Sequence, residues 1–194
     1  AGMASERLRL GKERLRVVES LAGVPAPAWN ELSGGDPFTS HEFLSALIDT
    51  GCAASRTGWR PQIVLLEKQN QLAGAMPLFL KSHSYGEYVF DWAWADAYER
   101  HGLRYYPKLL CAVPFTPVTG PRLLAAHDAD RAVLLAAALE MARELSSLHV
   151  LFPPDEQAGL MHDAGMLLRR TVQFHWRNEG YGTFEDFLAK ERSI

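Results

Sequence analysis

The order of hydrophobic and polar residues predicts short strands in the first half of the chain. Residues 14–21, 62–67 and 72–80 are apolar runs of strand length. A polar turn over residues 68–71 separates the last two runs, which is typical of a β-hairpin. Pro77 within the third run indicates a bulge or an edge position, because proline has no backbone N–H to donate.

Further strands are expected later in the chain. Residues 87–91 follow a turn and read as a strand, and residues 109–124 read as two extended segments around an irregular, proline-rich loop. Residues 148–152 form a nearly continuous apolar run, as in a buried central strand. Apolar and polar residues alternate over 167–177, the period of a strand with two different faces.

The first predicted helix follows residues 23–37, which glycine and proline mark as a loop. Thr39 is expected as its N-cap, with Glu42 completing a capping box, and Phe38 and Phe43 have the spacing of a hydrophobic staple. Gly51 is placed to end this helix.

Four more helices are expected. They cover residues 94–100, residues 128–145 with Asp128 as cap, residues 154–165, and a last helix that begins at Thr183 with Asp186 at its third position. Hairpins interleaved with helices predict a mixed α/β (α+β) fold, in which a central, mostly antiparallel sheet is flanked by helices.

Composition is that of an ordinary globular protein. Of the 194 residues, 47% are hydrophobic and 22% charged, and the net charge of −3 gives no support to DNA binding. Cys52 and Cys111 are too few for a disulfide scaffold or a zinc cluster, and the scattered histidines lack metal-ligand spacing, so no metal is expected. No apolar run is long enough to span a bilayer and the N-terminus lacks a signal-peptide pattern, so we expect a cytoplasmic protein.

Three segments carry a family resemblance. Residues 77–124 (PLFLKSHSYGEYVFDWAWADAYERHGLRYYPKLLCAVPFTPVTGPRLL), 146–153 (SSLHVLFP) and 173–188 (QFHWRNEGYGTFEDFL) resemble, in order, blocks of the FemAB-like predicted N-acyltransferases, a bacterial family named for peptidoglycan biosynthesis. The resemblance implies a GNAT-like acyltransferase fold. It also implies transfer of an acyl or aminoacyl group to an amine, with acyl-CoA or aminoacyl-tRNA as donor and a small molecule or a cell-wall precursor as acceptor.

The resemblance also implies an organisation of the chain. Residues 1–13 are expected to be a tag or a disordered N-terminus, and residues 14–194 a single GNAT-like domain. Because family members continue into a Lys/Arg-rich stretch and a second GNAT-like half, this domain is expected to be the first half of a protein truncated at its C-terminus. The missing half would be a partner, and an apolar edge that it leaves exposed favours self-association.

A phosphate-binding turn for a CoA donor is not found where the fold would place it. The loop over residues 120–127, before the helix at 128, lacks the Q/R-x-x-G-x-G/A pattern whose backbone N–H groups hold a pyrophosphate. Residues 71–76 nearly fit the pattern but lie in an expected strand. The residues that bind a cofactor are therefore unknown, and this domain is expected mainly to contribute an acceptor groove.

The first candidate for that groove is a block of aromatic and acidic residues. Its members are Asp91, Trp92, Trp94, Asp96, Tyr98, Glu99, His101, Tyr105 and Tyr106. The rings would stack on a substrate, and Asp91 or Asp96 would act as a general base. Alternatively, the rings are core residues, which is the more usual role of tryptophan, and the acids are caps and surface charges.

The second candidate is the proline-rich loop. Its rigid backbone suits a channel wall that contacts substrate through Phe115, Thr116 and Thr119, with Lys108 or Arg122 meeting an anionic group. A plain β-bulge connection is the alternative. The third candidate is the polar face of residues 167–177, where Gln173 would bind substrate and His175 would act as a base, or where both simply cover a half-exposed sheet.

If the groove binds acceptor but lacks donor chemistry, the domain is a non-catalytic binding module of GNAT-like fold. The sequence alone leaves both functions open.

Overall fold

The structure, a computed structural model, describes residues 9–10 and 13–191. Its strands form two sheets, of which the five-stranded sheet is antiparallel throughout and the four-stranded sheet has one parallel pair. The five-stranded sheet has the order β1 (Arg9–Leu10), β2 (Glu13–Val18), β4 (Ile63–Lys68), β5 (Gln71–Met76), β8 (Leu124–Ala125). The four-stranded sheet has the order β3 (Trp59–Pro61), β6 (Leu78–Lys81), β7 (Lys108–Cys111), β9 (Leu148–Val150), and its parallel pair is β7 with β9.

Pro77 lies at the point where the two sheets separate. The β4–β5 hairpin turns through Gln69 and Asn70, which both have positive φ. After Met76 the chain passes Pro77 and enters β6, which pairs with β3 and β7. Proline cannot donate a ladder hydrogen bond, so the strand is interrupted at Pro77, as expected. The apolar run over residues 72–80 is therefore divided between the two sheets.

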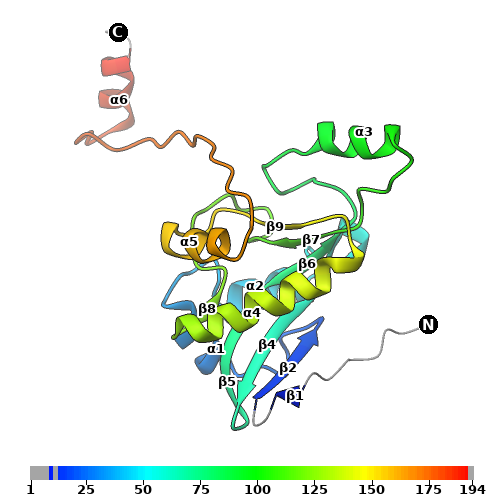
Figure 1. Cartoon of the computed structure of the whole chain (residues 1–194). Helices are drawn as coiled ribbons and strands as arrows, with labels where there is room; N and C mark the ends of the chain where they lie inside the picture. The colour runs from blue at the N-terminus through cyan, green and yellow to red at the C-terminus, as the bar shows by residue number, and fades with distance from the viewer. Residues whose placement is uncertain (1–8, 11–12, 192–194) are drawn as a thin grey trace.

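Both faces of the five-stranded sheet are covered by helices, namely α1 (Ala26–Ser33), α2 (His41–Asp49), α4 (Asp128–Met141) and α5 (Asp155–Asp163) (Figure 1). Two further helices, α3 (Trp92–Arg100) and α6 (Phe184–Glu191), stand away from the sheets, and 3₁₀ turns lie at Ser55–Thr57 and Ala142–Glu144. Ile63 and Leu65 of β4 face the cluster built by α1 and α2, whereas Val64 and Leu66 face the cluster built by α4 and α5. Burial on both faces explains why β4 is continuously apolar.

The mixed α/β class is confirmed, and the arrangement is consistent with a GNAT-like α+β fold. The expected hydrophobic staple is present, since the rings of Phe38 and Phe43 meet edge to face at 5.6 Å. The N-cap of α2 is Ser40 rather than Thr39. Thr183 and Asp186 exchange the hydrogen bonds of a capping box before α6, as predicted.

The predicted loop over residues 23–37 is wrong, because it contains α1. Pro25 is the N-cap of this helix and Pro27 lies in its first turn, where no intrahelical N–H bond is lost. Trp29 fixes the helix to the core, since it is fully buried and its indole N–H donates to the Thr39 carbonyl at 2.8 Å.

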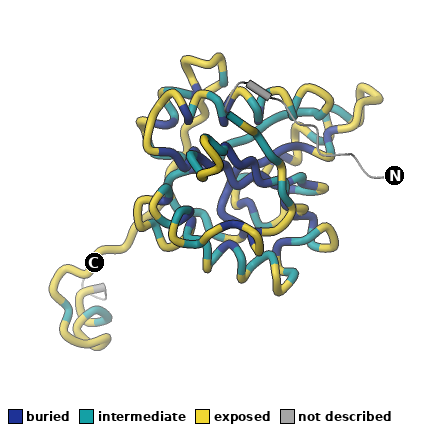
Figure 2. The backbone as a smooth tube through the Cα atoms, turned by 90° about the horizontal axis from the view of Figure 1, so that it is seen from below, coloured by how far each residue is buried: buried dark blue, intermediate teal, exposed yellow. Residues whose placement is uncertain are grey.

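Three strand predictions are also wrong in part. Residues 87–91 are irregular, because Glu87 turns into a buried ionic cluster described below. β9 lies at the edge of its sheet rather than at the centre. Residues 167–177 keep their alternating pattern but have no ladder partner among the residues described, and they lead away from the body of the protein as an exposed segment (Figure 2).

The expectation for residues 1–13 falls mostly outside the described residues, and Arg9–Leu10 pair with β2. No helix within the described ranges is long and apolar enough to cross a membrane.

Candidate functional site

The chain between β6 and β7, residues 82–107, forms a projection that we call the aromatic lobe. It contains α3 and stands away from the sheets in Figure 1. Large side chains of this lobe are exposed, namely Tyr85, Tyr88, Phe90, Trp92, Trp94 and Leu103. Trp92 and Trp94 are therefore not core residues, since more than half of each side chain is accessible.

The lobe rests on four buried charges that we call the neck cluster: Lys81, Glu87, Asp91 and Lys108. Lys81 ends β6, Lys108 begins β7, and the two residues pair directly in the antiparallel register. Like charges at such a position repel each other. The lobe supplies the compensating charges, because Lys108 Nζ donates to Glu87 Oε2 at 2.8 Å and also to Asp91 Oδ2.

Lys81 is held differently from Lys108. Its ammonium group lies 3.7 Å from the centre of the Trp59 ring, donates to the Tyr85 carbonyl at 3.1 Å and is 4.0 Å from Glu87 Oε1. Burial lowers the pKa of Lys81 to about 7. Burial also raises the pKa of Glu87, whose Oε1 is buried and accepts no hydrogen bond within the described part of the chain.

Asp91 is fixed as a carboxylate. Burial alone would raise its pKa, but the hydrogen bond and charge of Lys108, together with the two tyrosine hydroxyls, lower the pKa of Asp91 to about 2. Tyr105 donates to Oδ2 and Tyr106 to Oδ1, each at 2.8 Å. Burial and the Asp91 charge raise the pKa of both phenols, that of Tyr106 to about 12. A carboxylate held in this way is a weak base near neutral pH.

Asp91 connects the neck cluster to the exposed rings. Its side chain points into the body, while its carbonyl accepts from the Trp94 and Ala95 amides at the start of α3. The neighbouring Phe90 and Trp92 rings lie 4.8 Å apart on the outside. The backbone that carries these two rings is therefore held by a buried anchor one residue away.

His149 of β9 extends the buried network from the neighbouring strand. Its Nε2 lies 3.4 Å from the Tyr105 hydroxyl, and burial, with the Lys108 charge, lowers the pKa of His149 to about 4. Sequence reasoning missed Lys81, Glu87 and His149. One feature of the sequence could have pointed to the buried lysines: Lys81 directly follows one apolar run, and Lys108 directly precedes another.

The proline-rich loop packs against the base of the lobe. The amide of Phe115 donates to the Gly86 carbonyl at 3.2 Å, and its ring lies 5.4 Å from the Trp59 ring. The Thr116 hydroxyl bonds within the loop to the Pro114 carbonyl, and Thr119 is exposed. The loop and the lobe thus share Trp59 as common support.

Arg122 lies beneath the loop and is completely buried. Its guanidinium donates to the carbonyls of Val118, Gly120, Pro121 and Leu151 at 2.7–3.2 Å. All three guanidinium nitrogens thus bond to backbone oxygen atoms, which fixes the loop. In this conformation the side chain is not presented to an external anion.

Of the remaining predicted residues, only Tyr98 borders the neck cluster. Gln173 reaches the loop, donating from Nε2 to the Pro117 carbonyl at 2.8 Å, whereas His175 is exposed. Asp96 is exposed on α3, and Tyr98 is half-buried with its ring 5.2 Å from that of Tyr105. The structure therefore brings together Asp91, Tyr98, Tyr105, Tyr106 and Lys108.

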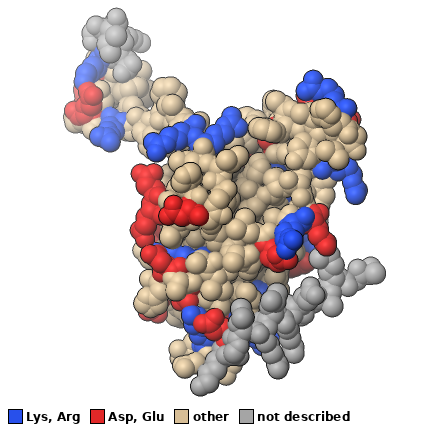
Figure 3. Space-filling view, viewed as in Figure 1, with Lys and Arg blue, Asp and Glu red and all other residues tan. Residues whose placement is uncertain are grey.

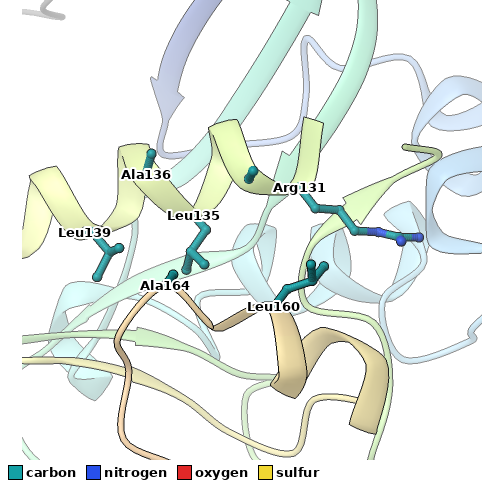
Figure 4. A pocket seen from close by; sticks show the side chains of 7 residues that line it. Arg131, Leu135, Ala136, Leu139, Leu160 and Ala164 are labelled. Carbon is teal, nitrogen blue, oxygen red and sulfur yellow. The ribbon is translucent and has the colours of Figure 1, made fainter. Parts of the chain in front are cut away.

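A shallow groove between α4 and α5 is apolar apart from one arginine (Figure 4). It is lined by Arg131, Ala132, Leu135, Ala136, Leu139, Leu160 and Ala164. Arg131 pairs with Asp128 and Glu156 at 2.6 and 2.9 Å. Asp128 and Asp130 occupy the first turn of α4, and their charge opposes an anionic ligand at that helix N-terminus. Among the described residues, no group of three potential metal ligands is found.

The fold and this site define a mixed α/β domain in which buried charges support an exposed aromatic lobe. Residues 20–193 match the FemAB-like family, described as peptidoglycan biosynthesis/recognition. The match extends over most of the chain, and the chain therefore belongs to the FemAB-like family. No curated protein and no solved structure matches the chain.

Proposed function

We propose that this domain provides the acceptor-binding part of an N-acyltransferase that acts on a peptidoglycan precursor. One observation carries the proposal: Asp91, held by Lys108 and two tyrosines, anchors the backbone of the lobe beside the exposed Phe90, Trp92 and Trp94 rings. Exposed rings on an anchored backbone offer flat apolar faces to a ligand. The role in peptidoglycan biosynthesis or recognition comes from the family.

The proposed acceptor groove lies between the lobe and the exposed segment that follows α5. Figure 3 shows a saddle-shaped hollow between these two parts. Gln173 approaches the proline-rich loop from the side of the segment. The donor would be an acyl-CoA or an aminoacyl-tRNA, and the intact enzyme would take the amine proton with a base and stabilise the oxyanion with hydrogen-bond donors.

Binding of a soluble muramyl pentapeptide, followed by calorimetry, tests the acceptor role. We expect Trp92→Ala and Trp94→Ala to weaken binding by about 1–2 kcal/mol each, as for other aromatic contacts. Phe184→Ala is the matched control, because Phe184 is also exposed but lies on α6, outside the lobe and outside residues 166–178. Unchanged affinity in both lobe variants, or an equal loss in Phe184→Ala, would contradict the proposal.

A non-catalytic binding module is the second candidate, and the state of Asp91 favours it. A carboxylate with a pKa of about 2 and three donors is not poised to accept a proton from an amine. The chain is incubated with labelled acetyl-CoA or a charged tRNA and the same pentapeptide. Product formed by this chain alone would exclude the binding-module function, whereas binding without product would support it.

A further inference from the structure

The segment after α5, residues 166–178, which we call the C-terminal arm, is exposed along nearly its whole length. Leu167 is 99% and Phe174 98% accessible, and Leu168, Val172 and Trp176 are also exposed. Figure 2 shows the arm leaving the body of the protein. Exposed apolar side chains in such a number mark a surface that contacts something apolar.

The charge of the arm differs from that of the protein. Arg169, Arg170 and Arg177 lie within it, and no acidic residue occurs from Ala164 to Asn178, although the whole chain has a net charge of −3. Figure 3 shows basic side chains along the arm and acidic side chains on the flank of the body below it. The arm therefore combines local positive charge with exposed aliphatic and aromatic groups.

The aromatic lobe adds exposed apolar surface on the same side of the molecule. In Figure 1, α3 and the arm both lie beyond the same end of the sheets. The lobe adds the exposed Trp92, Trp94 and Leu103. Its exposed Arg100 and Arg104 are balanced by the exposed Asp96 and Glu99, so the excess of positive charge belongs to the arm.

We propose that the C-terminal arm binds the surface of a membrane that contains anionic lipids. Arg169, Arg170 and Arg177 would contact the lipid phosphates, and Phe174 and Trp176 would insert at the headgroup level, where aromatic rings are favoured. Such binding lies in the plane of the interface and needs no membrane-spanning helix. It does not depend on the proposed acceptor role of the lobe.

The aliphatic residues favour a lipid surface over a nucleic acid. Phe174 and Trp176 could stack on bases, and the arginines could meet phosphates in either case. Leu167, Leu168 and Val172 gain nothing from stacking, whereas acyl chains would remove them from water. A second copy of this chain would also cover the apolar groups and would offer the acidic side chains of its flank, so dimerisation is one of the outcomes that the test below separates from lipid binding.

The test is co-sedimentation of the full chain with phosphatidylcholine vesicles that contain or lack phosphatidylglycerol. We expect binding only with the anionic lipid, and release at an ionic strength of ~1 M, where screening acts over about 3 Å. Arg169→Gln with Arg170→Gln should weaken partition about thirtyfold, because each arginine near an anionic surface contributes about fivefold. Arg14→Gln with Arg143→Gln is the control, since these partly exposed arginines lie elsewhere.

Three results would overturn the proposal. The first is equal sedimentation of the wild-type chain with both kinds of vesicle. The second is equal partition of the two double variants. The third is that the wild-type chain binds no vesicles but dimerises with rising concentration, and that the arm variants abolish the dimer. If the chain binds a single-stranded RNA probe more tightly than the anionic vesicles, the ligand of the arm is a nucleic acid and the lipid proposal is wrong. Because the vesicles contain no acceptor, failure here leaves the pentapeptide binding test unaffected.

Discussion

Lys81 and Lys108 lie directly opposite each other on neighbouring strands, at the two ends of the aromatic lobe. Both side chains are fully buried. Their repulsion is offset by Glu87 and Asp91, which the lobe itself brings to them. The lobe is thus attached to the body through charges that are paired only while the lobe is in place. Removing one member should disturb the whole attachment.

Replacing Lys108 by methionine should therefore destabilise the protein strongly. Methionine fills the space but leaves two buried carboxylates without their main cation. Breaking a buried pair in this way typically costs about 3–5 kcal/mol, because the remaining charge stays desolvated. Urea unfolding of wild type and Lys108→Met measures the difference in the free energy of unfolding.

Arg60→Met is the matched control for this change. Arg60 pairs with Glu19 at 2.5 Å, but both side chains are about half exposed. Exposed pairs contribute only about 0–1 kcal/mol. Equal losses for Arg60→Met and Lys108→Met would show that the buried charges of the neck cluster are no more important than a surface pair.

Much of the fold could be predicted from local pattern. The β4–β5 hairpin, the break at Pro77, and α2, α4, α5 and α6 follow from periodicity and capping signals that act within a few residues. The strand predicted over residues 167–177 was wrong because alternation describes only the strand itself. A ladder also needs a partner, which the described chain does not supply.

The candidate site was predictable only in part, for a similar reason. Asp91, Tyr105 and Tyr106 could be singled out because they are close together in a conspicuous aromatic block. Glu87, Lys81 and His149 join them through strand register and lobe conformation, which depend on contacts between distant parts of the chain. The predicted role of Arg122 rested on its charge, whereas its surroundings in the fold are backbone carbonyls.

Asp91→Asn should lower the pKa of Tyr106. The Asp91 charge opposes formation of a second negative charge on the phenol, so the neutral amide removes one cause of the raised value of about 12. We expect Tyr106 to titrate below 12 but above 10, because burial remains. Absorbance titration of the tyrosines measures this shift. Asp96→Asn, on the exposed side of the same lobe, should leave the titration unchanged.

His149 should make stability depend on pH between about 4 and 6.5. Its pKa is about 4 in the folded protein and 6.5 when unperturbed, so in this window the unfolded chain binds the extra proton. The free energy of unfolding should then rise with pH through the window and fall again as the solution is acidified. Asp91 contributes mainly below the window, where its own carboxylate becomes protonated.

The variant His149→Gln isolates this contribution. Glu87, whose pKa is raised, gives a slope of the opposite sign above pH 4.5, so the wild-type curve alone is a sum. Urea unfolding of both proteins at several pH values should give a less positive slope for His149→Gln. Parallel curves would mean that His149 is not buried in its neutral form.

Gly86→Ala should separate the lobe from the proline-rich loop. Gly86 has φ of +79°, and a Cβ there would lie 2.6 Å from the Phe115 ring and 3.2 Å from Trp59 Nε1. The ring would have to move, although the Phe115 amide bonds to the Gly86 carbonyl. Gly102→Ala is a close control, because Gly102 has φ of +69° in the same lobe but no atom within 4 Å of the added carbon.

In the control Gly102→Ala, the free energy of unfolding should fall by about 1–2 kcal/mol, the cost of an alanine in the left-handed conformation. In Gly86→Ala it should fall by that amount and by about 1–3 kcal/mol more, because overpacking destabilises well-packed regions. Thermal unfolding of the two variants measures the difference. Because the displaced ring of Phe115 shares Trp59 with Lys81, Gly86→Ala should also weaken pentapeptide binding more than Gly102→Ala does. Equal stability and equal binding of the two variants would show that the loop does not support the lobe.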